Sequence, residues 1–240
     1  MKKIPKWPVA QVGEKGLWDG VVHLDYYILR VLAGSSVPAP VLRKCFPEIP
    51  QTCLELGIGP FGLGLLAFLP EYPNRFGVDP LPRVSMESTN SSPLESSEEI
   101  RSYMRKMRAS IQYIQGCGEE IPVRSESMDL VICCNVLDHT SDPDAVLREI
   151  RRVLKPNGKF FFNVDTFSRL GLVKWHLLTK HLHRDEIMVT THPYRMYEAD
   201  AEHRLRKAGF QLKKVQGHTF VSNLIGHSRD STYLGTKCSP

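Results

Sequence analysis

The stretch at residues 52–82 constrains the fold more than any other part of this 240-residue chain. A short apolar run leads into a turn that contains four glycines, Gly57, Gly59, Gly62 and Gly64. A brief helical pattern of apolar residues follows at 63–69 and stops at Pro70, and a second strand-like piece at 75–78 ends on Asp79. This order predicts a strand, a tight turn, a helix and a second strand, which is the βαβ unit of a parallel sheet.

The same stretch predicts a nucleoside site. Glycines let the backbone approach a ligand closely, and the amides that open a helix face that ligand. Asp79 follows Gly62 by 17 residues, near the distance of roughly 20 at which an acid meets a ribose hydroxyl in such units. Gly57, Gly59 and Gly62 also match the dinucleotide fingerprint G-x-G-x-x-G literally.

Composition indicates an ordinary globular protein. Hydrophobic residues make up 42% and charged residues 24% of the chain, and the net charge is +5. No basic run is interleaved with aromatic residues, so no nucleic-acid partner is expected. The basic N-terminus lacks the apolar core of a signal peptide, and no apolar run approaches the roughly 20 residues of a membrane span. The six cysteines show no CxxC spacing, which favours reduced thiols and a cytoplasmic location.

Three later strings carry a family resemblance. Residues 116–122 (GCGEEIP) follow a predicted strand at 110–115, and residues 135–143 (NVLDHTSDP) end a predicted buried strand at 127–135. After a helix that Asp142 caps, residues 152–162 (RVLKPNGKFFF) lead into a strand at 159–164. Together with Glu55 before the first glycine, these strings resemble the class I S-adenosylmethionine-dependent methyltransferases, in particular those of ubiquinone and menaquinone biosynthesis.

The resemblance implies a Rossmann-like α/β fold, with a seven-stranded, mostly parallel sheet flanked by helices and an antiparallel last strand. Helices are expected at 98–109 and 198–208, and residues 210–216 and 231–237 form the expected final hairpin. Residues 1–50 are expected to form an N-terminal helical extension that either covers the donor or packs on the sheet. The methyltransferase domain is expected at 51–240, with an acceptor-side insertion at 168–195.

The resemblance also implies that S-adenosylmethionine is the cofactor. An acid two residues before the first glycine suits the donor's positively charged amino and sulfonium groups, whereas it does not suit a pyrophosphate. The family commonly has Asp where this chain has Cys117, so backbone groups would replace the usual carboxylate contact with the adenine amine. The expected cofactor-binding residues are Glu55, Gly57, Gly59, Gly62, Asp79, Cys117, Gly118, Glu119, Asn135 and Val136.

His139 is the first candidate for a general base. The end of the predicted fourth strand opens onto the crevice where donor and acceptor would meet, and an imidazole suits proton transfer near neutral pH. A packing or donor-orienting role for His139 remains the alternative, and His192 is a weaker candidate base. The histidines at 176, 181 and 183 lack metal-ligand spacing, so no metal is expected.

The expected function is methyl transfer to a small organic acceptor, with O-, N- and C-methylation all open. One alternative is an NAD(P)-dependent oxidoreductase that uses the same glycine turn. Tyr233 and Lys237 match the Tyr-x-x-x-Lys pair of short-chain dehydrogenases, but they fall in a strand-like segment where that family has a helix. The second alternative is a non-catalytic protein that keeps the methyltransferase fold.

Overall fold

The computed structural model describes residues 39–84, 98–168, 196–217 and 228–238. Single positions described outside these ranges are 12, 15, 16, 170, 171, 173, 177 and 194. Most of the expected N-terminal extension, most of the acceptor-side insertion and His192 lie outside the described residues. The division into an extension and a catalytic domain therefore stays a prediction.

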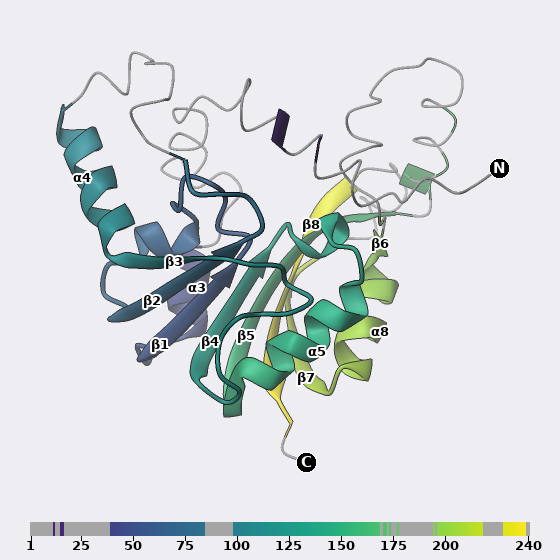
Figure 1. Ribbon diagram of the computed structural model, residues 1–240. Coiled ribbons are helices and arrows are strands. Elements are labelled where there is room, and N and C mark those ends of the chain that lie inside the picture. Colours follow the sequence, from purple (N-terminus) through teal and green to yellow (C-terminus); the bar gives the residue numbers. More distant parts are fainter. Residues whose placement is uncertain are drawn as a thin grey trace.

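A single mixed sheet organises the described chain (Figure 1). Its strands are β1 (Thr52–Leu56), β2 (Asn74–Asp79), β3 (Ile111–Gln115), β4 (Met128–Cys134), β5 (Leu154–Phe167), β6 (Met196–Tyr197), β7 (Phe210–Gln216) and β8 (Ser228–Lys237). The order is β3-β2-β1-β4-β5-β8-β7, and the two-residue β6 pairs with β5. All pairings are parallel except those of β8 with β5 and β7. The predicted Rossmann-like sheet with an antiparallel last strand is therefore confirmed, and the short β6 is an addition to it.

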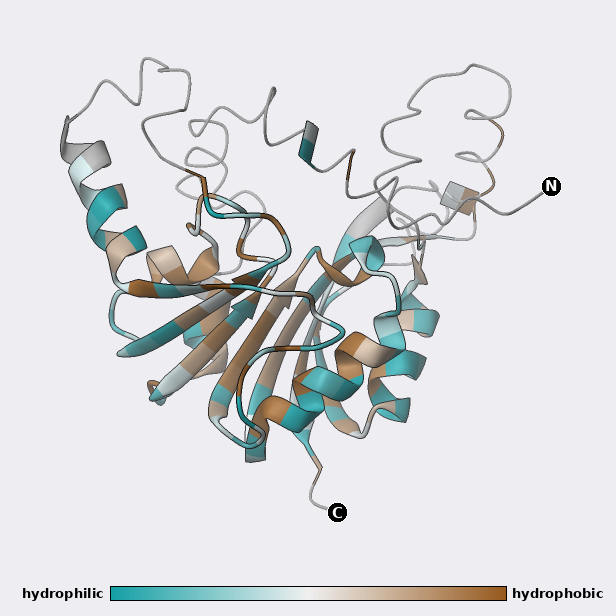
Figure 2. Ribbon diagram, in the orientation of Figure 1, coloured by the Kyte–Doolittle hydropathy of each residue, from teal (hydrophilic) through white to brown (hydrophobic). Residues whose placement is uncertain are grey.

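Helices cover both faces of this sheet. The helices are α3 (Ala39–Cys45), α4 (Glu98–Ala109), α5 (Pro143–Val153) and α8 (Glu198–Lys207), with the 3₁₀ helices η1 (Leu65–Phe68) and η3 (Leu137–His139). Buried residues of α5 and α8 pack in one hydrophobic cluster, and those of α3, η1 and α4 pack in another. Figure 2 shows the central strands and the sheet-facing side of α5 as hydrophobic and the outer side of α5 as hydrophilic. None of the helices in the described ranges is both long and apolar enough to cross a membrane.

Local signals fix the ends of several elements. Asp142 caps α5, because its Oδ1 accepts hydrogen bonds from the amides of Asp144 at 2.9 Å and Ala145 at 3.0 Å, and Pro143 occupies the first turn. The predicted bounds of α4 agree with the structure. The helix α3 lies within the expected helical extension at 1–50, but its own bounds were not predicted, although its Leu42 is fully buried against the sheet. Seven residues next to prolines give too short a pattern to distinguish a helix from a loop.

The segment after the glycine turn differs from the prediction. The expected helix at 63–69 is only the four-residue η1. Two buried ionisable side chains hold this short turn. Glu55 accepts hydrogen bonds from the amides at its start, and Arg75 donates to the carbonyls of Leu66 and Leu69 at its end. Pro70, two residues after the end of η1, prevents the helix from continuing.

Candidate active site

The glycine turn brings the ends of β1, β2 and β4 close together. Gly57 has a φ of 74°, and a Cβ at this position would lie 2.2 Å from Cγ2 of Val136. Only glycine fits there, because the left-handed backbone and the close approach both exclude a side chain. The Gly57 amide donates to the carbonyl of Val78 at 2.8 Å, which ties the start of the turn to β2.

Asp79 fixes the other side of the turn. Its residue is 5% exposed, and its Oδ2 accepts a hydrogen bond of 2.8 Å from the Gly59 amide. Its Oδ1 accepts one of 3.0 Å from the amide of Leu81. Both carboxylate oxygens of Asp79 thus accept backbone hydrogen bonds at the edge of the turn.

Glu55 faces the interior of the fold. Its carboxylate accepts hydrogen bonds of 2.7 Å from the Leu65 amide and 2.8 Å from the Leu66 amide. Burial raises the pKa of Glu55 from 4.5 to about 7, and the two amides offset part of that shift. A Cβ at Gly64 would lie 2.4 Å from the Glu55 carboxylate, so glycine is needed here for space. Glu55 therefore fixes the shape of the glycine turn from the interior of the fold.

The loop after β3 supplies a second wall. Burial raises the pKa of the Cys117 thiol, and Glu119 adds to that effect. The Oε1 of Glu119 accepts hydrogen bonds from the amide of Ser141 at 2.7 Å and from its hydroxyl at 2.6 Å. This loop is thereby attached to the chain that follows β4. At Gly118, an added Cβ would meet Leu56 Cδ2 at 3.0 Å.

The end of β4 supplies the third wall. Asn135 has a φ of 51°, a left-handed conformation that is uncommon outside glycine and that asparagine tolerates best. Its amide donates to the carbonyl of Asn163 on β5 at 2.9 Å. The chain then turns sharply into η3, which presents His139 at the carboxyl edge of the sheet.

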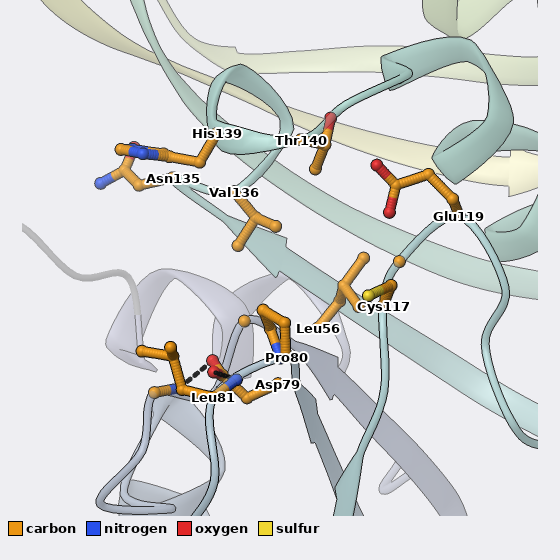
Figure 3. A pocket seen from close by; sticks show the side chains of 13 residues that line it. Leu56, Asp79, Pro80, Leu81, Cys117, Glu119, Asn135, Val136, His139 and Thr140 are labelled. Carbon is orange, nitrogen blue, oxygen red and sulfur yellow. Dashed lines mark hydrogen bonds between the residues drawn. The ribbon is translucent and has the colours of Figure 1, made fainter. Parts of the chain in front are cut away.

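These segments line one pocket (Figure 3). In that view Asn135 and His139 lie on the β4 side, while Asp79 and Leu81 lie across the pocket on the β2 side. The lining residues are Leu56, Gly57, Gly59, Asp79, Pro80, Leu81, Cys117, Gly118, Glu119, Asn135, Val136, His139 and Thr140. The structure therefore brings together eight of the ten expected cofactor residues and His139. Glu55 and Gly62 are not among the lining residues.

Four lining residues were not predicted: Leu56, Pro80, Leu81 and Thr140. Each lies within two residues of a predicted residue, so the signal for them was position near a strand end. Their apolar atoms complete the pocket between the polar groups. Among the described residues, no group of three or more His, Cys, Asp or Glu side chains is arranged to hold a metal ion.

The pair that suggested a dehydrogenase is part of the sheet. Tyr233 and Lys237 lie on β8, and Tyr233 is fully buried. The Lys237 ammonium donates to Leu154 O at 2.7 Å and to Glu126 Oε1 at 3.1 Å. Neither residue lines the pocket, so the match to the Tyr-x-x-x-Lys pair has no catalytic geometry.

Comparison with known proteins also indicates a methyltransferase domain. Residues 54–162 match the family model described as "Methyltransferase domain". The ubiquinone biosynthesis O-methyltransferase of Pseudomonas putida is 32% identical over 114 residues, which are 44% of this chain and 45% of that protein. The enzyme of the same name from Xanthomonas oryzae is 35% identical over 112 residues, 43% of this chain and 44% of that protein. The chain thus spans less than half the length of these curated relatives.

Solved structures share the fold over a longer stretch. The YcgJ protein of Bacillus subtilis has a TM-score of 0.60 at 17% identity and covers 84% of this chain and 98% of its own. An S-adenosylmethionine-dependent methyltransferase of Thermotoga maritima has a TM-score of 0.57 at 19% identity and covers 95% of this chain and 99% of its own. At these identities the likeness establishes the fold.

Proposed function

We propose that the chain, whose residues 54–162 match a methyltransferase domain family, transfers a methyl group from S-adenosylmethionine to a hydroxyl group of a small organic acceptor. The main support for this proposal is the position of four segments that are far apart in sequence and were each predicted to bind the donor. They line a single pocket at the carboxyl edge of the parallel strands. That edge is where open α/β sheets bind their ligands.

The lining residues fit an adenosyl compound. Asp79 would hold the ribose hydroxyls, and the backbone at Cys117 and Gly118 would hold the adenine between apolar side chains. The backbone of Gly57 and Gly59, with Asn135 and Val136 opposite, would face the methionine end. In this arrangement Glu55 contributes by holding the turn in place. When bound, S-adenosylmethionine supplies an electrophilic methyl group.

The remaining task of the protein is alignment and proton removal. Methyl transfer is an in-line displacement. Holding the acceptor in line with the methyl group therefore removes much of the entropic part of the activation barrier. A hydroxyl acceptor must also lose its proton, and His139 lines the pocket where a base is needed. The curated relatives named as O-methyltransferases support oxygen as the receiving atom.

Two measurements on the purified chain test this function. Calorimetry should detect binding of S-adenosylmethionine and S-adenosylhomocysteine but not of NADH or NADPH. Methyl-labelled donor should then transfer its label to a hydroxyl acceptor in a panel of phenols, amines and carbon acids. Preference for a nicotinamide cofactor would contradict the proposal, and failure to bind any of these compounds would favour a non-catalytic scaffold.

The variant His139→Ala tests the base. Turnover should fall by about 10²–10⁴-fold, the usual contribution of general acid–base catalysis, while affinity for S-adenosylhomocysteine changes less than about twofold. Turnover and affinity are measured on the same preparation. A large loss of affinity would instead place His139 in the donor site, and unchanged turnover would remove it from the mechanism.

A further inference from the structure

The residue before the proposed base is a buried acid. Asp138 is 5% exposed, and its Oδ2 lies 3.6 Å from Nε2 of His139. Removing a carboxylate from water costs free energy, and the cost is offset only where the charge is paired or hydrogen-bonded. Asp138 is neither a pocket-lining residue nor a predicted donor-binding residue, so its charge has no role in the function proposed so far.

The backbone around this pair is held firmly. Within the turn, the His139 amide donates to Val136 O at 2.9 Å, and the Thr140 hydroxyl donates to Leu137 O at 2.8 Å. From outside the turn, the Tyr194 amide donates to the carbonyl of Asp138 at 3.2 Å. The backbone that carries the carboxylate and the imidazole is therefore held in place by hydrogen bonds within the protein.

We propose that Asp138 is a positioning residue for methyl transfer: its carboxylate holds the His139 imidazole at the pocket and stabilises the imidazolium formed there. This inference rests on the proposed function, in which His139 is the base. During transfer, the acceptor oxygen forms a bond to the methyl carbon, and the sulfonium sulfur keeps the electron pair of the bond that breaks. The hydroxyl proton passes to the imidazole, whose new positive charge lies beside Asp138.

An opposite charge this close favours the charged form of an imidazole. The carboxylate therefore stabilises the product of proton transfer. Replacing it with a neutral isostere should lower the pH at which the His139 imidazole titrates and slow the reaction at its plateau. A residue that only supports the fold would change stability without moving the titration of His139.

Other ionisable groups surround the turn. They are Asp165 on β5, Asp230 on β8, Cys133 and Cys134 on β4, and Glu119 across the pocket. Burial raises the pKa of Asp165 to about 6, and Asp230 and Asp138 add to the shift. Asp165 thus titrates in the same range as a histidine. A pH profile alone would not separate the two residues, so the imidazole must be observed directly.

The experiment follows the His139 ring by NMR in the full chain with S-adenosylhomocysteine present. His139→Gln identifies the signal, and wild type, Asp138→Asn and Asp165→Asn are titrated. In Asp138→Asn the midpoint should fall by about one pH unit, whereas Asp165→Asn should lower it by less than half as much. Where an acceptor is in hand, kcat of Asp138→Asn should fall about 10-fold or more, part of the 10²–10⁴-fold that a base supplies.

The possible results distinguish the positioning role of Asp138 from the proposed methyltransferase function. An unchanged midpoint in Asp138→Asn, or an equal shift in Asp165→Asn, would overturn the positioning role even in an active methyltransferase. Absence of methyl transfer to any acceptor would count against the proposed function, while the titration would still report on the pair. If Asp138→Asn proves unstable, Asp138→Glu provides a second test, in which a retained carboxylate should restore most of the wild-type midpoint.

Discussion

Asp79 joins two tasks in one side chain. Its carboxylate holds the Gly59 and Leu81 amides and also faces the pocket where a ribose would lie. Asp79→Ala should weaken binding of S-adenosylhomocysteine by about 1–3 kcal/mol, because a ligand hydroxyl and two amides lose their acceptor. Titration calorimetry measures the change.

The matched control for this variant is Asp129→Ala. Asp129 is also a carboxylate on the parallel sheet, but it binds Thr52 and Lys155 away from the pocket. Its loss should lower stability and leave donor affinity unchanged. If Asp79→Ala bound the donor as well as wild type, the ribose would have to lie elsewhere.

Glu55 makes stability depend on pH. Burial raises its pKa to about 7, so between pH 4.5 and 7 the folded protein holds a proton that the unfolded chain has released. The free energy of unfolding therefore falls as pH rises through this window and is level above it. From pH 5 to pH 8 wild type should lose about 2–3 kcal/mol relative to Glu55→Gln, which lacks the titrating group.

Urea unfolding at both pH values measures this difference. Taking wild type relative to Glu55→Gln cancels the contribution of Asp165, whose raised pKa acts in the same direction. An equal pH dependence in the two proteins would show that Glu55 remains charged throughout. In that case its two amide hydrogen bonds would outweigh the effect of burial.

Among the elements, η1 is shorter than the sequence predicted. The glycines, the proline and the acid of this segment are all visible in the sequence, and they predicted the turn and the second strand correctly. The apolar spacing at 63–69 predicted a helix, yet the inward orientation of Glu55 and Arg75 decides the outcome. Side-chain orientation across a sheet depends on contacts between distant strands, which no local pattern contains.

The fit between Glu55 and η1 is tested by Gly64→Ala. Gly64 has a φ of −68°, so an alanine meets no backbone strain there, but its Cβ would lie 2.4 Å from the buried carboxylate. The substitution should therefore destabilise the fold by about 1–3 kcal/mol, as overpacking does in well-packed cores. Urea unfolding at neutral pH provides the measurement.

The control substitution is Gly16→Ala, because a Cβ at Gly16 would meet nothing within 4 Å. Its effect on stability should stay within about 0.5 kcal/mol. A neutral Gly64→Ala would mean that Glu55 moves aside without cost, and the short 3₁₀ turn would then need another explanation.

In the molecule as a whole, the pocket results from the order of the strands in the sheet. The glycine turn follows β1, Asp79 ends β2, and the segments at 116–119 and 135–140 follow β3 and β4. These four strands lie side by side with their carboxyl ends at one edge. The sequence could predict these segments because parallel strands place their ends together. It could not predict the pairing of His139 with a buried Asp138, because spacing does not show which neighbouring side chain turns toward the imidazole.

This arrangement predicts how the molecule responds to the donor. A ligand that spans the pocket should slow amide hydrogen exchange at all four segments together, since each supplies a wall. Residues 155–159 lie at the amino end of β5, at the edge of the sheet opposite to the pocket, and serve as the internal control, with unchanged exchange. Exchange measured by mass spectrometry with and without S-adenosylhomocysteine tests this expectation. Protection limited to one segment, or stronger at 155–159, would mean that the adenosyl group does not occupy the space between β2 and β4.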